Sequence, residues 1–340
     1  MAGYLLRRLL LAVVTIVTVS FGAFVCFGTY LDPSYPLVLS PDQRPRHLVQ
    51  AYYHLTDPIV VRYWLWVKNF MYHGFGKPVS TNVFDGKVIE AQANIGPELW
   101  HAGWLTIQLM GFALVLVIVI SVVLGTVSSL RRGGAADAAV RALSYLSWSV
   151  PAFLIAFFFR RWFTGDQTAS GFIYGPQTIQ HAGNPAFLIG PPTGGFVDWF
   201  QHMTLPAVAL ALGLVGVYSR YVRSSMLASL GQPYTVVARA KGLSEGRIVV
   251  RHALRNSLIP FSSALSLEIG AIVGASLAAD WVFSLGGLAT LTIAALGRAD
   301  PFELTAVVMT VAAVVIAFMT LADLVVGWLD PRARVAAANR

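Results

Sequence analysis

Six apolar stretches dominate this chain, and each is long enough to cross a lipid bilayer as a helix. They run near Leu9–Thr29, Trp104–Leu130, Val140–Phe163, His202–Val222, Leu258–Ala278 and Leu304–Leu329. A hydrocarbon core of about 30 Å is crossed by about 20 helical residues. Charged residues make up only 12% of the 340 residues, about half of the roughly 25% found in soluble chains. The pattern predicts an all-α, polytopic membrane protein with about six transmembrane helices.

The first apolar stretch follows Arg7 and Arg8, an order that cleaved secretory signal peptides also show. A signal peptide has an apolar region of about 7–15 residues and a small-x-small cleavage site. Here the apolar run is longer and ends in Tyr30-Leu31-Asp32-Pro33, without such a site. We therefore expect a retained first helix. The predicted organisation is an N-terminus and first helix (1–30), an external segment (31–103) and a transmembrane domain (104–340) with an external loop at 164–201.

Lysine and arginine are unevenly distributed between the two sides of a six-span arrangement. The N-terminus, the Arg131–Arg141 loop, the Arg220–Arg255 segment and the C-terminal tail hold 15 of the 24. Short basic loops stay on the cytoplasmic side of a membrane. We therefore expect both termini to be cytoplasmic. The net charge of +8 then reflects this asymmetry and not a nucleic-acid-binding surface.

The cytoplasmic segment 231–260 contains signals for two short helices with a glycine between them. Pro233 suits a first helical position, and Gly242 suits a left-handed C-cap just after Lys241. Ser244 is the predicted N-cap of the second helix, and Glu245 lies in its first turn. A regular α-helix here would have a basic face and an apolar face. The basic face would carry Arg247, Arg251 and Arg255, and the apolar face would carry Val250, Leu254 and Leu258.

This segment and three other stretches resemble one family. Ala238-Arg239-Ala240-Lys241-Gly242-Leu243, followed by Arg251-His252-Ala253-Leu254-Arg255 and Pro260, is similar to the cytoplasmic loop of bacterial ABC-importer permeases, in particular the dipeptide/oligopeptide branch. The companion stretches are Tyr4–Leu10, Tyr53–Ile59 with Gly74-Phe75-Gly76, and Asp323 with Asp330–Arg334. They occur in the family's order and span nearly the whole chain.

The resemblance implies the ABC type I importer permease fold and the role of the first permease subunit in the bacterial inner membrane. It implies that 234–258 couples this chain to ATPase subunits, mainly through Ala238, Arg239, Ala240, Lys241, Gly242, Leu243, Arg251, His252 and Leu254. The implied partners are a second homologous permease, two ATPase subunits and an extracytoplasmic peptide-binding protein. The implied cargo is di- and oligopeptides.

Two departures from the family pattern affect these expectations. The general importer loop begins with Glu-Ala-Ala six residues before its glycine, where this chain has Val236, Val237 and Ala238. A docking salt bridge from that glutamate is therefore not expected. Before the last helix, Gly286 stands where proline is usual, which predicts a more flexible loop.

The chain lacks the sequence signatures of an enzyme. It has no Gly-x-x-x-x-Gly-Lys-Ser/Thr phosphate-binding loop, so we expect ATP and Mg to bind on the partner subunits and no cofactor to bind here. Its seven histidines are scattered and it has one cysteine, which predicts no metal site.

Ionisable groups inside the spans are the candidates for pathway or helix-pairing roles, because a charge at the bilayer centre is costly. Glu268 faces either the pathway, where it would attract a peptide's ammonium groups, or a neighbouring helix near the interface. Asp323 matches a family position and is expected to pair within the bundle, and Pro151 is expected to kink the third span.

Two alternatives to a peptide permease remain open from the sequence. Relatives in the same branch move nickel, glutathione or sugars, so the solute can differ. An ion-coupled secondary transporter is a second alternative, although the chain shows no half-to-half symmetry of the kind found in such proteins.

Overall fold

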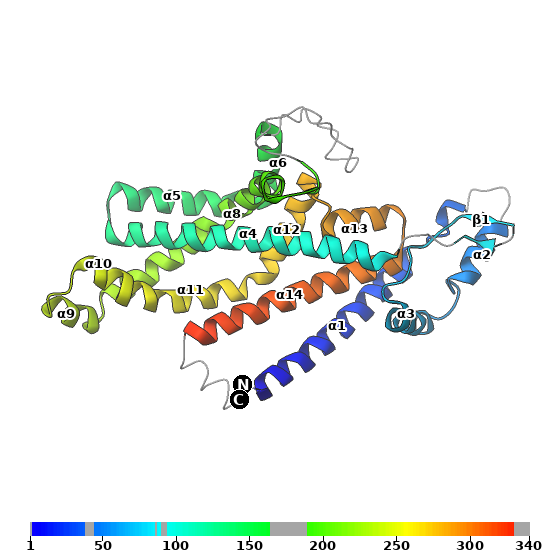
Figure 1. Cartoon of the computed structure of the whole chain (residues 1–340), viewed down its shortest axis with the longest axis horizontal. Coiled ribbons are helices and arrows are strands. Elements are labelled where there is room, and N and C mark those ends of the chain that lie inside the picture. The colour runs from blue at the N-terminus through cyan, green and yellow to red at the C-terminus, as the bar shows by residue number, and fades with distance from the viewer. Residues whose placement is uncertain (1, 38–43, 86, 90–93, 164–188, 330–340) are drawn as a thin grey trace. The chain divides into compact units, whose positions relative to one another are not determined.

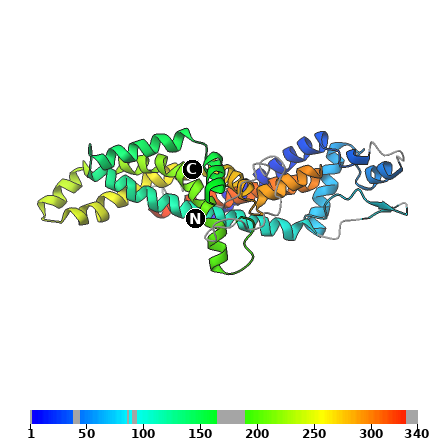
Figure 2. The same cartoon turned by 90° about the horizontal axis from the view of Figure 1, so that it is seen from above.

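The computed structural model describes residues 2–37, 44–85, 87–89, 94–163 and 189–329. It is helical apart from one two-stranded hairpin and the connecting turns (Figures 1 and 2). The chain divides into two compact units. One unit is formed by Ala2–Thr106 with Gly286–Val314, and the other by Ile107–Leu285 with the C-terminal part from Val315. Two long helices, α4 and α14, run through both units.

The unit built around the N-terminal third contains a long helix, two shorter helices and the hairpin. Its elements are α1 (Ala2–Tyr30), the 3₁₀ turn η1 (Tyr35–Leu37), α2 (Arg44–Tyr52), α3 (Ile59–His73), β1 (Val83–Phe84), β2 (Lys87–Val88), the start of α4 (Ile95–Leu130), α13 (Leu288–Gly297) and the start of α14 (Pro301–Leu329). The strands are antiparallel, with Val83 opposite Val88. The segment expected to be external therefore has a folded structure of its own.

A buried carboxylate connects that segment to the start of α14. One oxygen of Asp300 accepts the backbone N–H groups of Phe302 and Glu303 at 2.9 and 3.0 Å, which caps the helix. Its other oxygen accepts the Val79 N–H at 2.6 Å. Burial raises the pKa of Asp300, and these N–H groups oppose that rise.

The second unit is a helical bundle around α8. Its elements are the rest of α4, α5 (Ala135–Ser149), α6 (Ala152–Phe163), α8 (Phe196–Leu230), α9 (Pro233–Ala240), α10 (Glu245–Arg247), the π-helix η2 (Ile248–Leu254), α11 (Arg255–Leu267), α12 (Ile269–Phe283) and the end of α14. Helix α8 packs against α5, α6, α11 and α12. The core around it includes Val215, Tyr218, Val222 and Phe261.

The predicted spans agree with the helices in number and approximate position. Among the described residues, four helices are long and apolar enough to cross a membrane, and two bent helix pairs raise the number to six when each pair is one span. The first pair breaks around Pro151, and the second breaks at Glu268 with a bend of 60°. The all-α, polytopic prediction is confirmed.

Some boundaries differ from the prediction. Helix α4 begins at Ile95, before the expected Trp104, and α8 begins at Phe196, inside the expected loop 164–201. Asp198 in the first turn of α8 accepts the N–H groups of Thr193 and Gly194 at 2.7 and 3.1 Å, which stabilises this earlier start. The remainder of that loop up to residue 188, and the Asp330–Arg334 stretch, lie outside the described residues.

Two glycines allow the backbone of α8 to lie close to the backbones of its neighbouring helices. A methyl group at Gly216 would lie 2.6 Å from the Ser144 Cα of α5, and one at Gly125 of α4 would lie 2.7 Å from the Ser219 carbonyl oxygen. The Ser144 hydroxyl donates to the Gly216 carbonyl oxygen at 2.6 Å. Small residues permit this close packing in membrane bundles, where hydrogen bonds between helices add to it.

We predict that Gly216→Ala lowers the stability of the isolated chain by about 1–3 kcal/mol, because the new methyl group must displace backbone and not a flexible side chain. The midpoint of thermal unfolding of the purified chain measures the change. Gly274→Ala is the matched control, since a methyl group there meets no atom within 4 Å. Equal midpoints for the two variants would contradict this account of the α5–α8 contact.

Candidate functional site

The segment 231–260 begins with helix α9, whose start is held to the end of α8. Pro233 occupies a first-turn position after the N-cap Gln232, as predicted. The buried Thr235 hydroxyl lies 2.8 Å from the Leu230 carbonyl oxygen and 2.7 Å from that of Gln232. These contacts fix the angle at which α9 leaves α8.

Helix α9 ends in a Schellman motif centred on Gly242. The Leu243 N–H donates to the Ala238 carbonyl at 3.2 Å, and the Gly242 N–H donates to the Arg239 carbonyl at 2.9 Å. Gly242 has a φ of +76°, which glycine adopts without the steric cost that a side chain adds. The predicted left-handed cap is therefore present.

An ion pair closes this turn from outside. The Arg239 guanidinium donates to both oxygens of Glu245, at 2.7 and 3.2 Å, and this contact raises the pKa of Arg239. Both side chains are exposed, so the pair contributes little stability. Its two-point geometry nevertheless restrains α9 relative to α10. Sequence reasoning placed Glu245 in a first turn but did not pair it with Arg239.

The second predicted helix differs from the expectation in two ways. Ser244 is its N-cap, but the Ser244 side chain makes no capping hydrogen bond. The helix is not a separate short element, because it continues from Glu245 through Leu267 with a π-helical stretch at Ile248–Leu254.

The π-helical stretch changes which residues face the core. Val250, predicted on the apolar face with Leu254 and Leu258, is 66% exposed. The buried residues are Ile248, Val249 and Ala253. A π-helix closes its hydrogen bonds from i to i+5, so the spacing expected of an α-helix no longer applies. The predicted apolar face is wrong at Val250 for this reason, whereas Leu254 and Leu258 are partly buried against the core as predicted.

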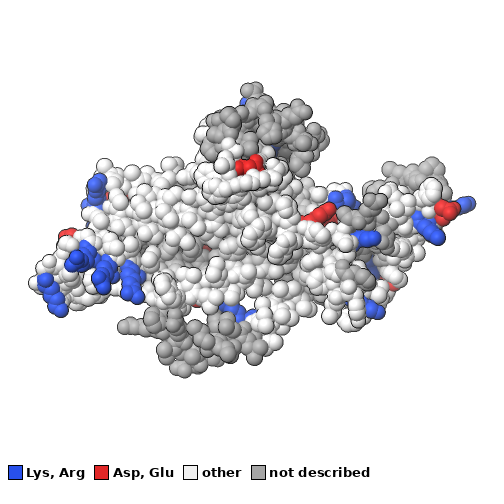
Figure 3. All heavy atoms as spheres, viewed as in Figure 1, with Lys and Arg blue, Asp and Glu red and all other residues white. Residues whose placement is uncertain are grey.

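A groove lies between the end of α8, the start of α9 and the η2–α11 junction. It has a volume of about 1220 Å³. Arg251, His252 and Arg255 line it, and Arg247 does not. Figure 3 shows Lys and Arg gathered over the α9–α10 end of the molecule. This end therefore presents a positively charged surface.

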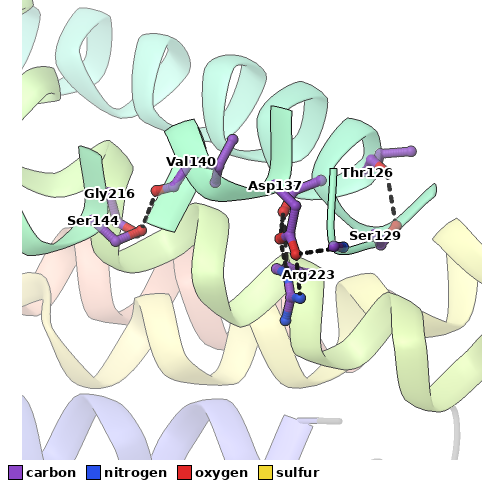
Figure 4. Close-up of polar contacts among 9 residues, drawn as sticks. Thr126, Ser129, Asp137, Val140, Ser144, Gly216 and Arg223 are labelled. Atoms are coloured by element: carbon purple, nitrogen blue, oxygen red, sulfur yellow. Dashed lines mark hydrogen bonds and ion pairs between the residues drawn. The ribbon is translucent and has the colours of Figure 1, made fainter. Parts of the chain in front are cut away.

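A buried ion pair just before the segment fastens three helices together (Figure 4). The Arg223 guanidinium of α8 donates to the two oxygens of Asp137 in α5 at 2.6 and 3.0 Å. The Ser128 hydroxyl of α4 also donates to Asp137 at 2.6 Å, as does the Gly133 N–H at 3.0 Å. The Asp137 side chain is 1% exposed and that of Arg223 is 20% exposed. The sequence analysis missed this pair, although an acid and a base near the ends of apolar spans were the available signal.

The three pathway candidates lie in different places. Pro151 stands at the break between α5 and α6, and Glu268 is an exposed residue at the break between α11 and α12. Asp323 is exposed near the end of α14 in the isolated chain. The structure does not gather these residues with 234–258 into one site. Among the described residues, no cluster of histidine, cysteine and carboxylate groups suits a metal ion.

A bundle of membrane-length helices with a positively charged helical projection defines this protein as a multi-pass membrane protein. Residues 117–335 match the family model of the binding-protein-dependent transport system inner membrane component. The chain belongs to this family, and its fold is that of the ABC type I importer permeases.

The similar proteins are permeases, and each aligns with this chain along nearly its whole length. A dipeptide transport system permease protein of Bacillus subtilis is 26% identical and covers 98% of this chain and 99% of its own. An oligopeptide transport system permease protein of Mycobacterium bovis is 27% identical, with 98% and 100% covered. A metal-staphylopine import system permease protein of Staphylococcus aureus is 27% identical, with 98% and 99% covered.

We predict that Asp137→Asn and Arg223→Gln each lower the thermal unfolding midpoint of the purified chain, because each leaves the other partner buried without its counter-charge. The double variant should lose less than the sum of the two single losses. Arg132→Gln is the control, because this arginine is exposed near the same loop. Additive losses would show that the two groups do not interact energetically.

Proposed function

We propose that this chain forms, with a second homologous permease, the translocation pathway of an ATP-driven importer of di- and oligopeptides. The observation that carries the proposal is that the family match at 117–335 includes the 234–258 segment, whose turn is stabilised by backbone hydrogen bonds. The names of the Bacillus and Mycobacterium relatives support peptides as the cargo.

The segment 234–258 is suited to dock on an ATPase subunit. Val236 and Val237 of α9 are 58% and 52% exposed, and Arg239, Lys241 and Arg251 are exposed around them. An exposed apolar strip with cationic neighbours is the chemistry of a protein contact surface. In the assembly, the partners would be two ATPase subunits carrying ATP and Mg, and an extracytoplasmic binding protein.

Movement of this segment would be transmitted as a rigid displacement. The Schellman turn joins α9 to α10, and the helix then continues without a break from Glu245 to Leu267. The first break in the helix beyond it is the 60° bend at Glu268. ATP-driven closure of the ATPase subunits would push on α9 and tilt η2 and α11 as one body, which is a hinge-type transition between two states.

The proposed topology places both termini and 234–258 in the cytoplasm, and places 31–103 and 164–201 outside. The positive-inside distribution of Lys and Arg supports it. The folded 31–103 segment would offer the surface for the binding protein.

A different solute is the second candidate, and the Staphylococcus relative favours it, since that protein's name assigns it to metal-staphylopine import. An ion-coupled secondary transporter loses its support, because the chain belongs to the family of binding-protein-dependent transport components.

We predict that Gly242→Pro abolishes transport and ATPase stimulation in the reconstituted importer while membrane insertion persists. Proline fixes φ near −65° and has no N–H, whereas Gly242 has a φ of +76° and donates to Arg239. Peptide uptake into proteoliposomes and co-purification of the ATPase subunits measure the effect.

Gly246→Ala is the matched control, because Gly246 lies in α10 with open space around it and should keep uptake near the parental rate. Surviving transport in Gly242→Pro would show that this segment is not the coupling element.

We predict that Glu268→Gln lowers uptake of lysine-containing peptides several-fold more than uptake of neutral peptides of the same length. The exposed carboxylate at the α11–α12 bend would attract cationic groups passing through the pathway. Competition between the two labelled peptides in proteoliposomes measures the ratio. An unchanged ratio with normal insertion would assign Glu268 to contacts with a neighbouring helix.

A further inference from the structure

A second pocket lies in the unit that contains 31–103. It has a volume of about 650 Å³ and is formed by α3, the turns on either side of it and the first turn of α14. Two stretches that resemble the permease family meet in it, since Tyr53 and His54 line it from one and Phe75 and Gly76 from the other. Its volume suits a ligand of a few residues or a small molecule.

The walls of this pocket are aromatic. Tyr53, Trp66 and Phe302 line it. Tyr53 lies 6.3 Å from Phe302 between ring centroids, and Trp66 is almost fully buried. Phe24 contacts both Trp66 and Phe302, at 5.9 and 5.8 Å, which holds these rings in place. Such walls bind an apolar or aromatic side chain through large contact area.

The inner wall carries a buried positive charge. Arg62 is only 8% exposed, and it makes no ion pair with any described residue. One of its terminal nitrogens donates to the Gly28 carbonyl oxygen at 3.0 Å, while its Nε has no hydrogen-bond partner among the described residues. Asp32 and Asp57 attract it only from a distance, and burial lowers its pKa. A buried cation without a contacting anion is costly.

The remaining polar residues of the pocket complement the same kind of ligand. Lys77 supplies a second cation, and Asn69 and Asn94 supply amide groups. None of the described residues that line it is a carboxylate. His54 has a φ of +54°, and a non-glycine residue with left-handed backbone often occurs at ligand sites.

We propose that this pocket binds the C-terminal residue of a peptide. The ligand's carboxylate would pair with Arg62 and Lys77, and its apolar side chain would lie between Tyr53, Trp66 and Phe302. The choice of a peptide carboxylate rests on the proposed function, whereas the anion-plus-apolar chemistry rests on the pocket itself.

The test compares the tripeptide Ala-Ala-Phe with its C-terminal amide, using the purified full chain in nanodiscs without partner subunits. Isothermal titration calorimetry measures both affinities. The free acid should bind at least about tenfold more tightly, because amidation removes the charge-assisted contacts. Lys77→Gln should weaken binding of the free acid about fivefold, and Lys68→Gln should not, since Lys68 is exposed on α3 and does not line the pocket.

Arg62→Gln should weaken binding most, but Arg62 also contacts Gly28 and its loss can disturb folding. The comparison of acid with amide on the unaltered chain avoids that problem. Equal affinities for acid and amide, or equal losses for Lys77→Gln and Lys68→Gln, would overturn the proposal. Glycerol phosphate that binds more tightly than Ala-Ala-Phe would assign the pocket to a phospholipid headgroup instead.

Failure here is distinguishable from failure of the proposed function. The binding measurement uses this chain alone, whereas the proposed function is tested by uptake and by co-purification of ATPase subunits. Peptide uptake without binding in the pocket would reject the pocket and keep the importer. Binding in the pocket without association of the ATPase subunits would keep the pocket and reject the importer.

Discussion

The close approach of α8 to its neighbours is the contact on which the bundle depends. In a bilayer, helices gain little from the hydrophobic effect when they meet, because lipid tails are as apolar as their side chains. Association must therefore come from close packing and from hydrogen bonds. Gly125 and Gly216 bring backbones together, and Ser144 donates across the α5–α8 contact. The Asp137–Arg223 ion pair joins the ends of the same helices, next to the segment proposed to couple to an ATPase.

This arrangement explains how a segment without a core of its own can act as a rigid element. Helix α9 buries only Thr235 and Ala238, so packing alone does not hold it. Its position depends on the hydroxyl contacts of Thr235, the Schellman turn at Gly242 and the Arg239–Glu245 pair. The following helix is anchored in the bundle core through Val249 and Ala253. The exposed surface, with Val236 and Val237 among cationic side chains, can thus remain accessible while the backbone stays defined.

Local signals in the sequence were sufficient for some parts of the site. Proline at a first helical position and glycine at a C-cap have fixed backbone preferences, so Pro233 and Gly242 could be placed without a partner. The apolar face of the second helix was placed correctly at Leu254 and Leu258 but not at Val250, because the π-helical stretch at Ile248–Leu254 changes the periodicity that the prediction assumed. The Asp137–Arg223 pair joins residues 86 positions apart, and no local pattern states which distant charges will meet.

The sequence by itself determined that this protein is a polytopic helical membrane protein, and it showed the resemblance to the importer permeases. Span length and charge distribution carry the membrane assignment, because a bilayer admits few structures whose backbone hydrogen bonds are all satisfied. The likeness to the permeases rests instead on motifs such as Ala238–Leu243. The tertiary structure alone decided where α8 touches its neighbours, which charges are paired, and that aromatic residues from distant stretches enclose Arg62 beside a pocket. Those features depend on the relative positions of helices, which follow from packing between segments and not from the pattern within any one of them.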